Sequence, residues 1–451
     1  MIRLAHKTVE KLHTSKALWL PTVWLFLACS RPVSLWTHIQ TIGTAADDQL
    51  EGSPLDRAIF TLLILGALIV LIGRGRRIAN LLRANLPILL FLAYCGISIF
   101  WSDFSDVAFK RWIRVVGDVA MVSIVLSEVS PLAGIKTLLA RLGFVILPLS
   151  VLFDIGRGFS GLTYHNGLTT NKNLYGAVAM VLGLAAVWRF LTARQNPERS
   201  KERINQLIAF GGLSLLALFC LWMANSATSI ASFGVGIIIL VIARRWSARS
   251  KPRTLHLLTA SLILLAVYVA LLNPNAGIVS AMGKDPTLTG RTEVWQIVIP
   301  MNPNPLLGAG FESFWLGPRL KHLWNIFVWK PNEAHNGYIE LYLNLGWVGL
   351  ALLAAIIVTG YRRNVGILRK DPELGSLKLA YLVAVLVYSM AEAGFRMFSP
   401  IWLAFLFSTV TIATPKRREA GNDSKRVAFR NVSEAVVTER QYQALMTGGS
   451  S

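Results

Sequence analysis

The sequence predicts an all-α, polytopic integral membrane protein, and its composition, its apolar segments and the placement of its basic residues all indicate this class. Hydrophobic residues make up 54% of the 451 residues, charged residues only 15%, and the mean hydropathy is +0.51. A soluble domain carries about a quarter charged residues, so one soluble core cannot bury this much apolar surface. The three cysteines, Cys29, Cys95 and Cys220, lie in or beside apolar runs, which favours packing over a disulfide or metal framework.

Apolar segments of roughly the length that crosses a bilayer, about 20 residues, recur about twelve times along the chain. They lie near 16–30, 56–73, 86–101, 115–130, 135–154, 173–191, 206–223, 226–243, 255–273, 336–359, 376–395 and 398–413. Threaded from a cytoplasmic N-terminus, these spans leave 47–56, 101–106, 156–173 and 274–335 outside. We therefore expect one membrane domain over 1–413 and, after an even number of spans, a disordered cytoplasmic tail over 414–451.

The net charge of +21 could indicate nucleic-acid binding, but the basic residues are distributed as topology signals. Short links between apolar runs hold most of the clusters, at 74–77, 194–203, 244–253, 361–364 and 415–418. Such loops mark the cytoplasmic side of a membrane protein, and the proposed threading places every one of them inside. Lys110, Arg111 and Arg114 are the exception, because they follow an outside segment. We expect no nucleic-acid partner.

Few charges lie deep in the apolar spans. Asp118 is one, and Glu392 with Arg396 forms an i,i+4 pair near the outer end of a predicted helix. Charges inside a membrane are functional candidates by default, but Glu392 and Arg396 are equally well explained as a neutralising pair that joins two helices. No internal repeat is visible, which weakens the case for an inverted-repeat transporter.

The external loop over 274–335 collects the polar chemistry. Trp315, Trp324 and Trp329 beside basic residues are typical of an interfacial belt, but a belt does not explain a loop this long. Long loops in compact proteins are often lids or binding elements. The loop cations Arg291, Arg319, Lys321 and Lys330 suggest an anionic substrate at the outer face of the membrane.

His335 stands at the predicted start of a helix, flanked by Glu333 and Asn336. A helix start can bind an anion through its free N–H groups, and a neutral imidazole there could take a proton from a hydroxyl. Alone, this histidine would be equally well explained as part of a helix cap. The basic loop beside it favours the functional interpretation.

The motifs in this region resemble the O-antigen ligase superfamily, which includes O-antigen polymerases and exopolysaccharide-production polymerases. The strongest block is AHNGYIELYLNLGWVGL at 334–350, after GRTEVW at 290–295 and NPLLGAGFESF at 304–314. TTNKN at 169–173 and WSDFSD at 101–106 add to the resemblance, whose strong part covers about 160–360. The order of these blocks is fairly specific for the superfamily but does not separate ligase from polymerase.

The resemblance implies a metal-independent, inverting glycosyl transfer at the periplasmic face of the bacterial inner membrane, without a cofactor. The donor would be a glycan on undecaprenyl pyrophosphate, and the acceptor a second glycan or a lipid core, with other polysaccharide assembly proteins as further partners. By motif position, Arg291 would stabilise the leaving pyrophosphate and His335 would activate or orient the acceptor hydroxyl. Lys172 is our candidate for a second phosphate contact. The other expected substrate contacts are Asn173, Arg157, Glu293, Trp295, Arg319, Lys321, Asn336 and Tyr338.

One departure concerns the outside turn at 225–229, which reads NSATS where many superfamily members carry a serine-arginine-glycine pattern. Either Lys172, Arg157 or a loop cation substitutes, or the chain handles phosphate differently. The SATS-type turn, with SRPVS at 30–34 and EGSPLDR at 51–57, favours exopolysaccharide polymerisation over lipopolysaccharide ligation.

Three alternatives remain open: an O-antigen ligase proper, a lipid-linked glycan flippase or other transporter, and a non-catalytic assembly subunit. A transporter should depend on Asp118, an enzyme on Arg291 and His335, and an assembly subunit on none of these.

Overall fold

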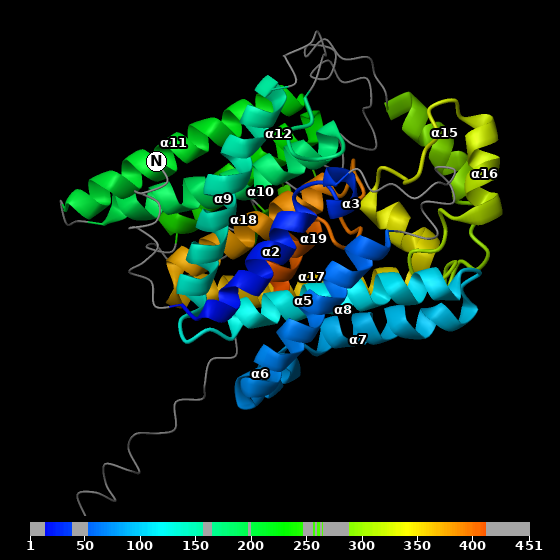
Figure 1. Cartoon of the computed structure of the whole chain (residues 1–451), viewed down its shortest axis with the longest axis horizontal. Coiled ribbons are helices and arrows are strands. Elements are labelled where there is room, and N and C mark those ends of the chain that lie inside the picture. The colour runs from blue at the N-terminus through cyan, green and yellow to red at the C-terminus, as the bar shows by residue number, and fades with distance from the viewer. Residues whose placement is uncertain are drawn as a thin grey trace, which may run out of the picture. The chain divides into compact units, whose positions relative to one another are not determined.

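The computed structural model describes residues 14–37, 53–156, 165–196, 200–246, 256–257, 259–261, 264 and 288–411, and every regular element in them is a helix (Figure 1). The all-α prediction is therefore confirmed. The predicted tail over 414–451 lies outside the described residues. The longer helices are α2 (Trp19–Ala28), α5 (Pro54–Gly73), α6 (Gly75–Ala84), α7 (Leu86–Ile97), α8 (Ser105–Leu126), α9 (Pro131–Gly156), α10 (Lys172–Gln195), α11 (Lys201–Ala224), α12 (Ala227–Trp246), α15 (Leu288–Val298), α16 (Gly317–Ile326), α17 (Gly337–Lys370), α18 (Pro372–Tyr388) and α19 (Pro400–Thr409).

Six of the described helices are long and apolar enough to cross a membrane: α5, α9, α10, α11, α12 and α17. A seventh span is possible where α6 and the segment Leu86–Trp101 meet at a bend of 86°. Each predicted apolar segment overlaps a described helix except 255–273, most of which lies outside the described residues. The count of twelve stays a prediction.

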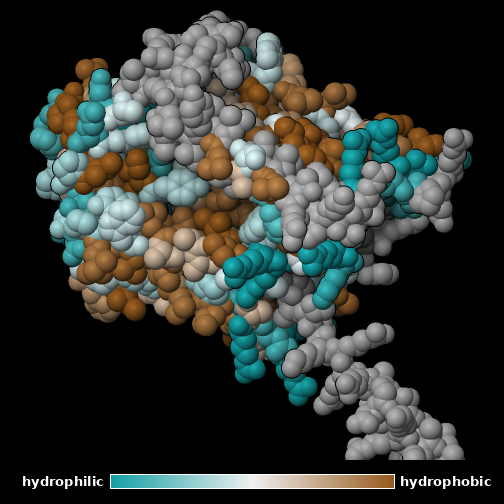
Figure 2. Space-filling view, turned by 180° about the vertical axis from the view of Figure 1, so that it is seen from behind, coloured by the Kyte–Doolittle hydropathy of each residue, from teal (hydrophilic) through white to brown (hydrophobic). Residues whose placement is uncertain are grey.

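The bundle is organised around α18 and α19, whose side chains are buried almost throughout. Peripheral helices instead expose large apolar side chains, such as Ile69 on α5 at 72% and Leu215 on α11 at 69%. Figure 2 shows hydrophobic side chains spread over much of one face of the molecule. Such faces suit a surrounding lipid phase, in which the backbone groups are satisfied within helices.

The chain between α18 and α19 is not helical. Residues 389–399 form turns and bends inside what the sequence predicted as the end of one span and the start of the next. The predicted i,i+4 pair of Glu392 and Arg396 is therefore wrong, because the two side chains bond to different partners. Irregular backbone at membrane depth is tolerated where it lines a cavity, and this segment does so.

Asp118 holds one end of this irregular segment. Its carboxylate accepts hydrogen bonds from Trp24 Nε1 (2.8 Å) and from the backbone N–H of Phe398 (3.1 Å). Phe398 has a φ of 53°, a conformation that side chains other than glycine rarely adopt. The buried acid thus anchors α2 and the start of the α19 segment to α8.

The loop before α17 has its own small core and docks on a break in α17. Val294, Phe314, Trp315 and Leu323 are among the buried residues of this core, which includes parts of α15 and α16. Gly346 interrupts α17 with φ 61° and ψ −161°, and the N–H groups that follow it, of Trp347 and Val348, donate to loop carbonyls. Trp315 is 4% exposed and donates to Glu340, so its interfacial-belt interpretation was wrong.

Candidate active site

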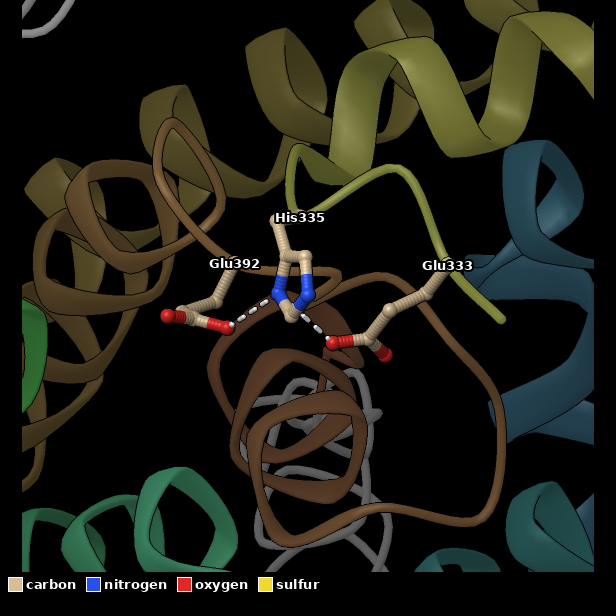
Figure 3. A group of neighbouring side chains, drawn as sticks. All are labelled: Glu333, His335 and Glu392. Atoms are coloured by element: carbon tan, nitrogen blue, oxygen red, sulfur yellow. Dashed lines mark hydrogen bonds and ion pairs between the residues drawn. The ribbon is translucent and has the colours of Figure 1, made fainter. Parts of the chain in front are cut away.

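Glu333, His335 and Glu392 come together where the loop before α17 meets the segment between α18 and α19 (Figure 3). The imidazole lies between the two carboxylates, with Nδ1 3.0 Å from Glu333 Oε1 and 3.1 Å from Glu392 Oε2. Carboxylates accept hydrogen bonds, so Nδ1 carries the proton in this arrangement. Nε2 makes no hydrogen bond to a described residue and remains available to a ligand.

Each carboxylate is also paired with an arginine. Arg291 on α15 donates to Glu392 Oε1 at 2.9 Å and to the carbonyl of Ala391. Arg396 contacts Glu333 Oε2 at 3.4 Å. The cluster therefore joins α15, the segment before α17 and the segment after α18 in one charged network.

The network sets the protonation of its members. Burial by itself favours the neutral imidazole, but the hydrogen bonds from Nδ1 to Glu333 and Glu392, with their negative charges, raise the pKa of His335 to about 9. Burial opposes ionisation of Glu333, yet the hydrogen bond from His335 and the charges of His335, Arg396 and Arg291 lower its pKa to about 2. At neutral pH the imidazolium predominates, and the neutral imidazole considered from the sequence is the minor form.

Local sequence explains the position of His335. Its φ is 46°, and the next residue, Asn336, caps α17 by accepting from the N–H groups of Tyr338 (3.0 Å) and Ile339 (3.1 Å). The N–H of Gly337 donates to Ser389 O. These first N–H groups are occupied, so the predicted anion site at this helix start was wrong.

A cavity of about 500 Å³ adjoins the cluster. Its lining comes from α2, α5, α8, α10 and the segment between α18 and α19, together with the loop residues Glu312 and Glu333. Glu333 and Glu392 line it, whereas His335 and Arg291 are not among its lining residues and contact these carboxylates instead. The side chains of His335 and Arg291 are 21% and 22% exposed, so both remain accessible.

Three of the predicted site residues meet in the cluster: His335, Arg291 and Asn173. Asn173 lines the cavity and donates to Glu392 Oε1 at 3.0 Å. Trp295 supports the cluster from α15 by donating to the carbonyl of Ala334 at 2.7 Å.

Two further predicted contacts, Asn336 and Tyr338, hold the start of α17 against the end of α18. Asn336 Nδ2 donates to Met390 O, and the Tyr338 hydroxyl donates to Leu386 O. Lys172 begins α10, but the described lining of the cavity includes its neighbours Asn171 and Asn173 and not Lys172.

The other predicted contacts lie elsewhere. Arg319 on α16 pairs with Asp103 at 2.8 Å and donates to the carbonyl of Phe314, so it ties the loop to the turn before α8. Glu293 and Lys321 are exposed and do not line the described cavity. Arg157 lies outside the described residues.

Sequence reasoning missed Arg111 and Arg114 of α8, which line the cavity with Arg396. The sequence did contain a sign of them, because both arginines follow a segment that was predicted to lie outside, where basic residues are not expected. A cationic pair on the wrong side of a predicted topology can mark a site rather than an error of threading. Glu312, in the GAGFESF block, is a further cavity residue that was not singled out.

Glu333, His335 and Glu392 could also hold a metal ion, because they offer ligand atoms within 4.8 Å of one another. A divalent cation would have to replace the proton on Nδ1 and compete with Arg291 and Arg396 for the carboxylates. These three side chains are therefore better suited to share the proton on Nδ1 than to bind a metal ion.

The NSATS turn holds no cation. Asn225 ends α11 with φ 48°, and Ser226 and Ser229 are buried against α10. A Cβ on Gly176 would lie 2.5 Å from Ser229 Oγ, so the turn is closely packed.

Comparison with known proteins agrees with the motif blocks. The model of the O-antigen ligase family matches residues 212–354, a range that contains Arg291 and His335. The exopolysaccharide production protein ExoQ of Rhizobium meliloti (strain 1021) is 26% identical over 372 residues, which cover 76% of this chain and 81% of that protein. A candidate polysaccharide ligase of Rickettsia bellii (strain RML369-C) is 24% identical over 199 residues, covering 43% of this chain and 48% of that protein. Another, of Rickettsia prowazekii (strain Madrid E), is 26% identical over 170 residues, 35% of this chain and 39% of that protein.

Proposed function

We propose that this multi-pass membrane protein, whose residues 212–354 match the O-antigen ligase family model, polymerises an exopolysaccharide from undecaprenyl-pyrophosphate-linked donors at the periplasmic face of the inner membrane. A ligase or polymerase role in polysaccharide synthesis is the part that the family supports. The observation that carries the finer proposal is His335 clamped between two carboxylates beside a charged cavity.

The cations of the network suit the departure of a pyrophosphate. Transfer breaks the bond between the anomeric carbon and the phosphate oxygen, so negative charge grows on the leaving group. Arg291 and the imidazolium of His335 can each donate hydrogen bonds to that charge. Their own carboxylate partners hold them in place before the donor arrives.

The acceptor hydroxyl must lose its proton as the new glycosidic bond forms. Glu333 is ionised at neutral pH, lines the cavity and contacts His335, and we assign it this role. Its low pKa is compatible with the role, because a hydroxyl that attacks an oxocarbenium-like carbon becomes strongly acidic. No metal is required in this scheme, so a chelator should leave the transfer rate unchanged.

The choice of polymerase over ligase rests on the extent of the similarity. The exopolysaccharide production protein matches most of this chain, whereas the two rickettsial proteins match less than half of it. A ligase that transfers a finished glycan to a lipid core is the second candidate, favoured by the names of those two relatives.

The test is polymer output and lipid-linked glycan in cells that carry His335→Ala or Arg291→Ala. We expect at least a hundredfold loss of polymer, with repeat units accumulating on the lipid carrier outside the membrane. His322→Ala, exposed on α16, is a matched control that should keep normal output.

Two results would count against the proposal. Normal polymer from both variants, at matched membrane levels, would contradict the catalytic assignment. Accumulation of lipid-linked units on the cytoplasmic side would instead indicate transport.

A further inference from the structure

Among the described residues, three arginines line the cavity, and they differ in how their charge is satisfied. Arg396 contacts Glu333 at 3.4 Å and Glu312 at 3.9 Å. Arg111 lies 3.9 Å from Glu312 and donates to its backbone carbonyl. Arg114, one turn along α8 from Arg111, makes no ion pair or hydrogen bond with any residue that the structure describes.

Arg114 is held in place by aromatic rings instead. Its guanidinium carbon lies 4.8 Å from the ring centroid of Phe60 and 5.2 Å from that of Phe398. The two rings pack edge to face, with centroids 4.7 Å apart. These contacts fix the guanidinium without using its N–H groups as donors to a described residue, so the N–H groups are free to bind a ligand.

The aromatic platform of Phe60 and Phe398 is itself held in place by Asp118 and Trp24. Asp118 accepts the N–H of Phe398 and the indole N–H of Trp24, and Trp24 packs on both phenyl rings. Both carboxylate oxygens of Asp118 are thus engaged by other donors. The buried acid contributes negative potential near Arg114 without bonding to it.

The other acids that act on this guanidinium electrostatically are engaged as well. Asp56 accepts from the backbone N–H of Ser34 at 3.2 Å and from its hydroxyl at 2.6 Å. Glu312 is shared between Arg111 and Arg396. The guanidinium of Arg114 is thus fixed in a cavity, and the neighbouring carboxylates are bonded to other donors. Such a guanidinium is suited to bind an anionic group of a ligand.

We propose that Arg114 anchors a second anion-binding subsite in the cavity, separate from the Arg291–His335 network. This subsite binds an anionic oxygen group of the substrate. The subsite deepens the proposed function and rests on it for the identity of the substrate. Two chemical sources fit: the diphosphate of the lipid carrier, or a carboxylate on an acidic glycan. Forked guanidinium donors bind both groups well, so only experiment distinguishes the sources.

The experiment measures equilibrium binding to the full chain in lipid nanodiscs. Farnesyl diphosphate serves as a short polyprenyl diphosphate, and a glucuronate-containing disaccharide serves as the carboxylate probe. For the probe that the subsite recognises, we expect Arg114→Gln to weaken binding at least tenfold and Arg114→Lys to restore it only in part. Phe60→Leu should weaken binding severalfold, because it removes one ring of the platform.

Lys110→Gln is the matched control, since Lys110 is an exposed cation on the same helix that does not line the cavity. It should bind both probes as the wild type does. Weaker binding of the diphosphate alone assigns the subsite to the lipid carrier, and weaker binding of the disaccharide alone assigns it to the glycan.

Wild-type affinity of Arg114→Gln for both probes would overturn the subsite and leave the proposed function standing. If the wild type itself binds neither probe, the subsite is overturned too. The proposed function is judged separately, by the polymer output of the His335 and Arg291 variants in cells.

Discussion

The protonation of His335 is decided by two carboxylates that come from different parts of the chain. Glu333 is two residues away, but Glu392 is 57 residues away in sequence. Burial alone would favour the neutral ring, but the two carboxylates raise the pKa of His335 to about 9, so the imidazole stays protonated at neutral pH. If the imidazolium is the working form, activity should persist at neutral pH and fall as the pH rises through about 9.

The measurement is the rate of transfer by purified enzyme between pH 6 and pH 10. Glu392→Gln removes one carboxylate, so the pKa of His335 should decrease toward its ordinary value and the alkaline fall should move to lower pH. A rate that instead rises about tenfold per pH unit from 7 to 9 would identify the rare neutral imidazole as the catalytic base.

At the residue scale, the sequence predicted the loop side of the site better than the membrane side. Arg291 and His335 stand in compact motif blocks, so their chemistry could be read locally. The partners could not, because Arg291 meets Glu392 across 101 residues and Arg396 meets Glu333 across 63. Glu392 and Arg396 were recognised as unusual charges, but helical spacing suggested that they pair with each other.

At the scale of elements, hydrophobicity located the helices and did not reveal their breaks. The segment between α18 and α19 was predicted as part of two apolar spans, yet it is not helical and it lines the cavity. Gly346 similarly breaks α17 within a strongly apolar run. In both places a tertiary contact, with Asp118 or with the loop carbonyls, replaces helical hydrogen bonding, and periodicity alone cannot show this.

Gly346→Ala tests how the loop is attached to the bundle. A Cβ at this position would lie 2.3 Å from the backbone of Leu306, and the backbone conformation is one that only glycine adopts easily. We expect a loss of stability of about 1–3 kcal/mol from the backbone alone, together with lower activity as the loop is displaced.

Thermal unfolding and polymer output check this expectation. Gly366→Ala is the control on the same helix, since a Cβ there meets nothing within 4 Å. It should match or slightly exceed the wild type in stability. Equal melting temperatures for the two variants would show that the loop does not depend on the break.

At the scale of the whole molecule, the amphipathic helix α6 suggests where the cytoplasmic membrane surface lies. It carries Arg76, Arg77 and Arg83, and the chain bends by 86° between α6 and the apolar segment that follows. A basic amphipathic helix at such an angle suits the anionic inner leaflet. The loop with α15, α16 and His335 would then face the periplasm, as the basic clusters of the sequence predict.

Single cysteines placed at the two surfaces decide this orientation. The native Cys29, Cys95 and Cys220 are buried, so they should give little background with a membrane-impermeant maleimide. Val328→Cys, at a position that is 96% exposed beside α16, should react in intact spheroplasts. Arg76→Cys on α6 should react only after the membrane is permeabilised. The reverse pattern would place His335 and the cavity on the cytoplasmic side, where lipid-linked glycans are assembled rather than polymerised, and the proposed function would then fail whatever the His335 and Arg291 variants do.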